Sequence, residues 1–232
     1  MQIRTLALAA FAAVTFHAQA DVVALWDYSA TPTTTKQTQS ANGASFAAIG
    51  GVITSFSAGV TTQALGTATY AAQGTGDMTR GVQYMVDTTG YTDLILSFAQ
   101  RNSATASAWT TLQYTLDGST WTTATSFQMP AASSTLFVQG LTYDFSAITG
   151  ANNNENFGIQ LLASFAPGTS AYLATGTGST YGTAGTIRYD NVLFSGTAIP
   201  EGPVDPIPEP STYAMLMAGL GVVSLLARRR AR

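Results

Sequence analysis

Apolar and polar residues alternate with a period of two through most of the segment 21–200. The alternation is clearest in DLILSFAQ (93–100) and TTLQYTL (110–116), where every second residue is leucine, phenylalanine or tyrosine. Such a period is typical of β-strands, because successive side chains of a strand point to opposite faces of a sheet. No 3.6-residue period is sustained over three turns in this segment. The pattern therefore predicts an all-β domain.

The expected strands are short and separated by turn residues. Asp117-Gly118 predicts a hairpin turn after the strand at 110–116, and the next strand is expected to begin at Trp121. About 180 residues are enough for one domain with a core of its own. Many short strands with frequent threonine and glycine predict an antiparallel β-sandwich or jelly roll across 21–199. Further strands are expected at 22–28, 51–57, 67–72, 81–87, 136–145, 157–165 and 186–195, and loops at 152–156 and 166–185.

The N-terminus has the three parts of a secretory signal peptide. Arg4 provides positive charge, residues 6–16 form the apolar segment, and Ala18-Gln19-Ala20 fits the small-x-small cleavage rule. Residues 1–20 are therefore predicted to be removed on export, which makes Asp21 the first residue of the mature protein. The alternative is an N-terminal helix buried in the fold.

The C-terminus combines an uncharged apolar segment with a cluster of arginines. As a helix, residues 212–227 would span about 24 Å, which is shorter than the roughly 30 Å hydrocarbon core of a bilayer. Local thinning of the bilayer and snorkelling arginines compensate for such a mismatch. The positive-inside rule places the cluster in the cytoplasm, whereas a core helix would bury it. We therefore predict a single transmembrane helix, followed by Arg228, Arg229, Arg230 and Arg232.

Pro208-Glu209-Pro210, the apolar segment and the terminal arginines follow one another in the order of a known signal. Together, residues 208–232 resemble the PEP-CTERM sorting signal of Gram-negative bacteria that make extracellular polysaccharide. The resemblance implies that exosortase, a membrane protease or transpeptidase, removes the helix. It also implies an intermediate anchored in the inner membrane, followed by release to the cell surface or extracellular matrix. Residues 200–207, which contain three prolines, are predicted to be an extended linker.

The composition of the exported part excludes several kinds of site. The chain has no cysteine, and its one histidine, His17, lies in the predicted signal peptide. This excludes Ser-His-Asp triads, Cys-His nucleophiles and ordinary zinc sites from the mature protein. Eleven acidic residues against four basic ones between Asp21 and Asp205 give a formal charge of −7, which argues against nucleic acid as a partner. Glycoside hydrolysis needs two carboxylates at a set separation, and no spacing singles out such a pair.

Three stretches in the middle of the chain carry a second resemblance. They are LSFAQRNSATASAWTTLQYTLDGSTW, LTYDFSAITGANNNENFGIQLLA and IRYDNVLFSG. Residues 93–196 resemble a β-sandwich ectodomain common among PEP-CTERM proteins, with Tyr114-Thr115 in place of its Tyr-Ser pair. This ectodomain is similar in outline to the jelly rolls of carbohydrate-binding modules. The resemblance brings no catalytic residues with it.

Two candidate sites follow from the residue types. Asp27, Asp190 and Asn191 lie in the first and last expected strands, which are neighbours in such jelly rolls, and their oxygens could hold a structural Ca²⁺. Alternatively, Asp190 pairs with Arg188 or Arg101, or accepts a hydrogen bond from a turn amide. Aromatic rings can stack on sugars through an exposed face, although large aromatics mostly belong to the core. The candidate stacking residues are Trp121, Tyr172 and Tyr181.

These observations predict a non-catalytic, exported protein of the cell surface or extracellular matrix that is sorted by exosortase. The expected setting is the exopolysaccharide of a biofilm, and no cofactor is expected apart from the candidate structural calcium. A carbohydrate-binding module is the alternative function. A hydrolase with an unrecognised carboxylate pair is a weaker alternative.

Overall fold

The computed structural model describes residues 20–29, 39–200, 215, 217–220, 228 and 229. The chain divides into two compact units, Met1–Ile199 and Pro200–Arg232. In the second unit all described residues are exposed, and those after Pro200 are helical. Among all described residues, no helix is long and apolar enough to cross a membrane. Residues 1–19, the Pro208-Glu209-Pro210 motif, most of the predicted span, Arg230 and Arg232 lie outside the described residues.

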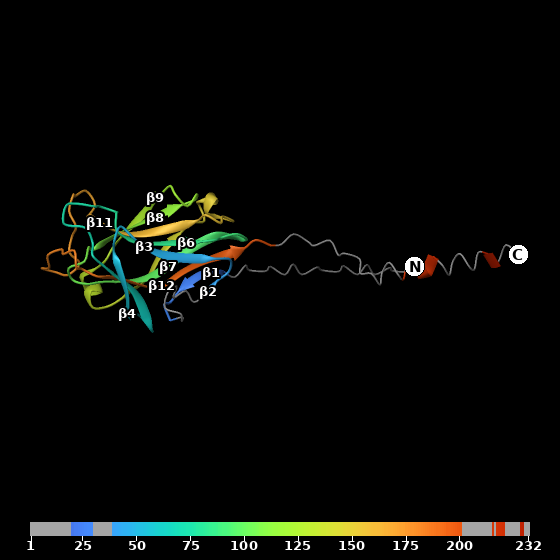
Figure 1. Ribbon diagram of the computed structural model, residues 1–232, viewed down its shortest axis with the longest axis horizontal. Helices are drawn as coiled ribbons and strands as arrows, with labels where there is room; N and C mark the ends of the chain where they lie inside the picture. The colour runs from blue at the N-terminus through green and yellow to red at the C-terminus, as the bar shows by residue number, and fades with distance from the viewer. Residues whose placement is uncertain (1–19, 30–38, 201–214, 216, 221–227, 230–232) are drawn as a thin grey trace, which may run out of the picture. The chain divides into compact units, whose positions relative to one another are not determined.

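The first unit is a sandwich of two antiparallel sheets, as the alternating pattern predicts (Figure 1). The seven-stranded sheet has the order β10 (Val138–Asp144), β7 (Tyr91–Asn102), β12 (Ile187–Ala198), β1 (Asp21–Trp26) and β2 (Gln39–Ser40). In the same sheet, β5 (Gln63–Ala68) pairs with β12 and with β4 (Ile53–Ala58). The five-stranded sheet has the order β3 (Ala44–Ile49), β6 (Gly81–Val86), β11 (Gly158–Ser164), β8 (Trp109–Thr115) and β9 (Thr122–Gln128).

The last strand organises the seven-stranded sheet. One edge of β12 pairs with β7 along most of its length. The other edge is shared, because Ile187–Tyr189 pairs with β5 and the later residues pair with β1. The expectation that the first and last strands are neighbours is therefore confirmed. Two short 3₁₀ helices, η1 (Ala131–Ser134) and η2 (Thr149–Ala151), lie in the connections before and after β10.

Two details of the predicted strands are wrong. A strand was expected at 67–72, but β5 ends at Ala68, and Thr69 adopts a left-handed conformation with φ of 71° that takes the chain out of the sheet. In addition, β2 and β3 were not expected. The sequence of β3, ASFAAI, is rich in alanine, which has little preference for strands, and its place in the sheet depends on pairing with β6.

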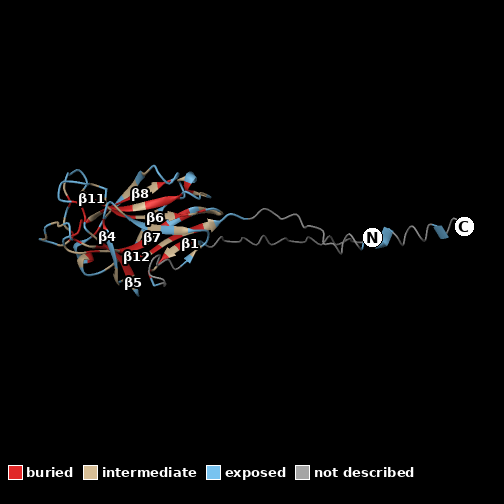
Figure 2. Ribbon diagram, viewed as in Figure 1, coloured by how far each residue is buried: buried red, intermediate tan, exposed pale blue. Residues whose placement is uncertain are grey.

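A chain of aromatic rings fills the space between the sheets. Trp26 packs against Tyr84 with ring centroids 4.9 Å apart, which joins β1 to β6. Phe157 contacts both Phe194 and Phe145, at 6.2 and 5.1 Å. All five side chains are fully buried, and Figure 2 shows buried residues along the strands of the sandwich. Burial of such large apolar surfaces is the main source of stability for a domain without disulfides.

Candidate functional site

Three glutamines lie side by side on the outer face of the five-stranded sheet. Gln160 of β11 is opposite Gln83 of β6 on one side and opposite Gln113 of β8 on the other. The residues that flank them in each strand pack into the core, so the alternation of strand side chains turns the glutamines outward. All three are half-buried. We call this set, Gln83, Gln160 and Gln113, the amide row.

Hydrogen bonds hold the amide row in place. The Gln160 Nε2 donates to Gln83 Oε1 at 2.9 Å, and the Gln113 Nε2 donates to Thr123 Oγ1 of β9 at 3.3 Å. Within the described part of the chain, the Gln83 Nε2 and the Oε1 atoms of Gln160 and Gln113 make no hydrogen bond. The row therefore offers a ligand on the sheet the Gln83 amide nitrogen, the second N–H of Gln160 and of Gln113, and two acceptor oxygens.

The surface around the amide row carries side chains of other types. Trp109, half-buried at the start of β8, lies on the same face four residues before Gln113, which is about 13 Å along the strand. At the other end, a groove of about 310 Å³ is lined by Ser45, Met85, Asp87 and Glu155, among others. Ser45 and Met85 are opposite one another on β3 and β6, two residues from the row. The face thus combines an aromatic ring, amides and carboxylates.

Sequence reasoning missed the amide row, although its signal is visible. Each of the three glutamines stands between two apolar residues in a strand, in VQY, LQY and IQL. Such a triplet places one long polar side chain on the outer face of a strand whose other face is buried. The strand register that brings the three triplets together cannot be read from the sequence.

The structure removes Tyr172 from the candidate stacking residues. Its side chain is only 4% exposed, and its ring lies between Phe165 at 4.6 Å and Tyr181 at 4.4 Å. The hydroxyls of both tyrosines donate to backbone carbonyls, that of Tyr181 to Ala71 O. Burial raises the pKa of Tyr172 well above its ordinary value and that of Tyr181 to about 12. The expectation of an exposed Tyr172 is wrong because the loop folds back on its own aromatic residues.

Trp121 lies apart from these two tyrosines. It is half-buried and directly precedes β9, after the turn at Asp117-Gly118. The carboxylate of Asp117 accepts hydrogen bonds from the amides of Ser119 and Thr120, and these bonds hold its pKa well below the ordinary value. The three candidate stacking residues therefore belong to two separate regions.

The structure places Asp190 and Asn191 at an irregularity of β12 beside the end of β1. Asp190 is 1% exposed, and its carboxylate accepts hydrogen bonds from the amide of Val60 at 2.6 Å and that of Asn191 at 2.8 Å. Burial raises the pKa of Asp190, and the nearby carboxylate of Asp27 raises it further, whereas the two amides lower it. The alternative that Asp190 accepts a turn amide is therefore confirmed. Among the described residues, no group of three or more His, Cys, Asp or Glu side chains gathers around this pair. The structural calcium site stays a prediction.

Replacing Asp190 with alanine is expected to destabilise the domain by about 1–3 kcal/mol, because two backbone amides lose their acceptor. The turn between β4 and β5, which holds Val60, would lose its attachment to β12. The exposed Asp144 accepts a single amide, that of Ser146, and Asp144→Ala is the matched control with a smaller expected loss. Urea unfolding of the full chain at neutral pH measures both. Equal losses would contradict the structural role of Asp190.

Comparison with known proteins decides what the C-terminus is. A model of the PEP-CTERM protein-sorting motif matches residues 206–230. The chain carries a PEP-CTERM sorting motif. The PEP-CTERM motif implies processing by exosortase and export to the cell surface. It includes Pro208-Glu209-Pro210 and three of the terminal arginines. No curated protein shows significant similarity to this chain.

Solved structures resemble the PEP-CTERM chain in its β-sandwich. One is the CBM22-1 xylan-binding domain of Xyn10C from Paenibacillus barcinonensis, with 14% identity over 80% of this chain and 100% of that domain, and a TM-score of 0.47. Another is the CBM22-1-GH10 modules of the N-terminal endo-1,4-β-D-xylanase 10B from Clostridium thermocellum, solved with xylohexaose. That similarity has 8% identity, covers 81% of this chain and 30% of the xylanase chain, and has a TM-score of 0.41.

Proposed function

We propose that this chain is a non-catalytic protein of the cell surface or extracellular matrix, and that its β-sandwich binds a neutral polysaccharide along the amide row. The observation that carries the proposal is the alignment of Gln83, Gln160 and Gln113 in one register across three strands. The PEP-CTERM motif supports the extracellular setting, where such a polymer would be met.

The chemistry of the amide row favours a neutral sugar over a charged ligand. Side-chain amides both donate and accept hydrogen bonds, as sugar hydroxyls do, and they carry no charge. Gln83, Gln160 and Gln113 are flanked at the ends of the row by Ala47 of β3 and Thr123 of β9, which are also uncharged. Adjacent strands are spaced by about 4.8 Å, so the row presents successive polar contacts along the direction in which a chain of sugars would lie. Trp109 adds a ring for an apolar sugar face.

The predicted domain plan fits this function. Residues 21–199 form the ectodomain, residues 200–207 link it to the sorting motif, and residues 1–20 direct export. Exosortase and the inner membrane are the expected partners before processing, and the exopolysaccharide of a biofilm is the expected partner afterwards. A surface with few charges stays hydrated in such a polymer without binding ions strongly.

Gln160→Ala is expected to weaken binding of a neutral oligosaccharide about tenfold, because it removes the central member of the row and frees Gln83. A glycan array on the full chain, in a detergent without sugar groups, selects the oligosaccharide, and calorimetry then compares the variants. Gln39→Ala, at an exposed glutamine of β2 on the other sheet, is the matched control and is expected to bind like the wild type. If both variants bind equally well, the amide row is not the binding surface.

The hydrolase alternative has one observation in its favour, since Asp87 and Glu155 line the same groove beside the row. Two carboxylates flanking a sugar are what glycoside hydrolysis requires. We expect the bound oligosaccharide to be recovered intact after prolonged incubation, as measured by mass spectrometry. Cleavage that disappears in Glu155→Gln but persists in Glu201→Gln would replace the binding function with hydrolysis.

A further inference from the structure

Two arginines stand opposite each other on the outer face of the seven-stranded sheet. Arg188 of β12 is the register partner of Arg101 of β7. Like charges directly opposite in a sheet are destabilising. They are also two of only four basic residues between Asp21 and Asp205, against eleven acidic ones. Half of the basic residues in this segment therefore lie where their positive charges repel each other.

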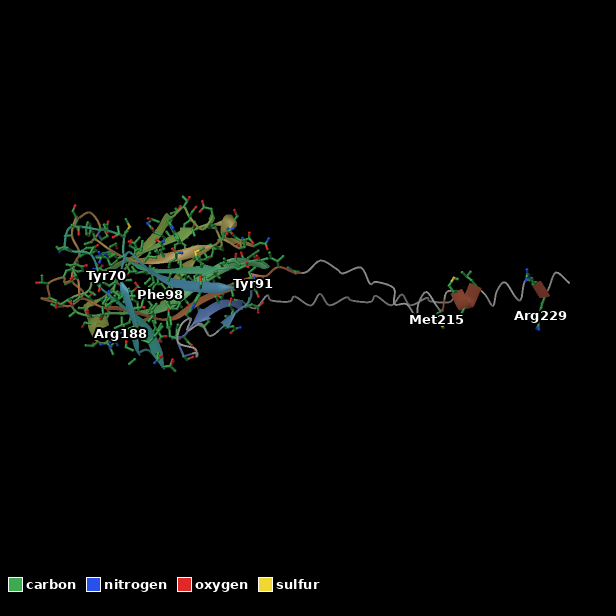
Figure 3. All side chains as sticks on the ribbon, in the orientation of Figure 1. Tyr70, Tyr91, Phe98, Arg188, Met215 and Arg229 are labelled. Carbon is green, nitrogen blue, oxygen red and sulfur yellow. The ribbon has the colours of Figure 1, made fainter. Side chains whose placement is uncertain are left out.

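The two arginines hydrogen-bond to backbone carbonyls, which carry no full negative charge. Arg101 donates to the carbonyl of Ser134 at 3.2 Å, and Arg188 donates to the carbonyl of Ala58 at 3.3 Å (Figure 3 labels Arg188). Within the described residues, neither guanidinium forms an ion pair. Asp190 follows Arg188 on the same face of β12, and its oxygens accept the amides of Val60 and Asn191 in place of a guanidinium N–H. Burial lowers the pKa of Arg188, and the charge of Arg101 lowers it further.

A groove of about 450 Å³ opens beside this arginine pair. The turn Ala58–Val60 forms one wall, the segment Thr135–Gln139 forms another, and Arg101 contributes to the lining. Arg188 reaches the first wall through its hydrogen bond to Ala58. Leu136 is 66% exposed in the second wall, beside the polar side chains of Thr135 and Gln139. The groove therefore combines the positive charge of Arg101 with apolar and uncharged polar side chains.

We propose that this groove binds the carboxylate of an acidic sugar, a uronate unit of a polysaccharide, between Arg101 and Arg188. Planar guanidinium groups match the geometry of a carboxylate, and an anion between them removes their mutual repulsion. Thr135 and Gln139 would contact sugar hydroxyls, and Leu136 would cover the apolar face of the ring. A free inorganic anion would leave most of the groove empty. The site is separate from the amide row, since it lies on the other sheet.

The overall charge of the domain limits which acidic polymers fit. Nine acidic residues against four basic ones in residues 21–199 give the ectodomain a formal charge of −5, which repels a densely charged polyanion over long range. The pair of arginines acts only at short range, because salt screens their field beyond about 8–10 Å. The expected ligand is therefore a polysaccharide with isolated uronate units among neutral sugars.

The test measures binding of a trisaccharide that ends in one glucuronate, by calorimetry on the full chain in a detergent without sugar groups. We expect it to bind about tenfold or more tightly than the matching neutral glucose trisaccharide, and less tightly as salt is raised. Arg101→Gln and Arg188→Gln should each weaken binding about 10- to 100-fold. Arg80→Gln is the matched control, because Arg80 also donates to one backbone carbonyl, that of Thr69, and should bind like the wild type.

The variants also report on folding without the ligand. Arg101→Gln is expected to melt at the temperature of the wild type or higher, since it removes a repulsion between neighbouring strands. Unchanged affinity in both arginine variants would overturn the proposal. So would inorganic phosphate that binds as tightly as the uronate and depends on the same two arginines, because the site would then recognise an anion without the sugar. Loss of neutral-sugar binding in Gln160→Ala would concern only the amide row. It would not change the uronate affinity of the arginine variants, because the two sites lie on different sheets.

Discussion

Replacing Trp26 with alanine is expected to destabilise the β-sandwich by about 3–5 kcal/mol. The side chain is fully buried and contacts Tyr84 of the opposite sheet at 4.9 Å and Phe194 at 6.2 Å. Its removal leaves a cavity at the point where three strands meet. Because a domain of this kind is stable by only about 5–15 kcal/mol, the loss is a large part of the total.

Trp121→Ala is the matched control for this substitution. Trp121 is half-buried and lies at the start of a strand of the five-stranded sheet, so a smaller loss is expected. Chemical unfolding of the full chain, followed by circular dichroism, compares the two variants. If Trp26→Ala is no less stable than Trp121→Ala, the aromatic packing between the sheets is not the main support of the fold.

Replacing Pro208, Glu209 and Pro210 together with alanine is expected to abolish removal of the C-terminal segment. Proline fixes φ and lacks an amide donor, so the tripeptide is predicted to stay out of the helix that follows and to remain accessible to exosortase. Glu209 is the only charged residue of the tripeptide, and it lies just before the uncharged segment. The variant should stay in the inner membrane with its arginines, whereas the wild type should reach the surface or medium.

The linker offers a control of nearly the same chemistry. Pro200, Glu201 and Pro203 also combine two prolines with one glutamate, but they lie before the matched motif. Their replacement with alanine should leave processing unchanged. Fractionation of a host that carries exosortase, with immunoblotting of each fraction, separates the two variants. Equal retention of both in the membrane would mean that linker stiffness, and not the motif, controls processing.

The sequence predicted the architecture well because one physical pattern dominates it. Period-two alternation locates nine of the twelve strands, and turn residues such as Asp117-Gly118 locate a hairpin. The pattern fails at β3, where alanines weaken the alternation, and at β5, where the left-handed Thr69 ends the strand early. Local propensity cannot anticipate a strand whose position depends on its partner.

The candidate sites were less predictable because they depend on register. The triplets around Gln83, Gln113 and Gln160 are visible in the sequence, but only the pairing of β6, β11 and β8 brings them together. The same holds for Arg101 and Arg188, which meet through the pairing of β7 and β12. Aromatic residue type alone was misleading for Tyr172, since a glycine-rich loop can still bury its rings against one another.

The intact mass of the mature protein tests the central claim most directly, which is that the C-terminus is a sorting signal that exosortase removes. The protein is recovered from the surface and medium of a host with exosortase and from the membrane of the same host without it. We predict that the first sample lacks the apolar segment and the arginines, and that the second still ends at Arg232. A mature protein that ends at Arg232 in both hosts would contradict the account and make the segment a permanent anchor.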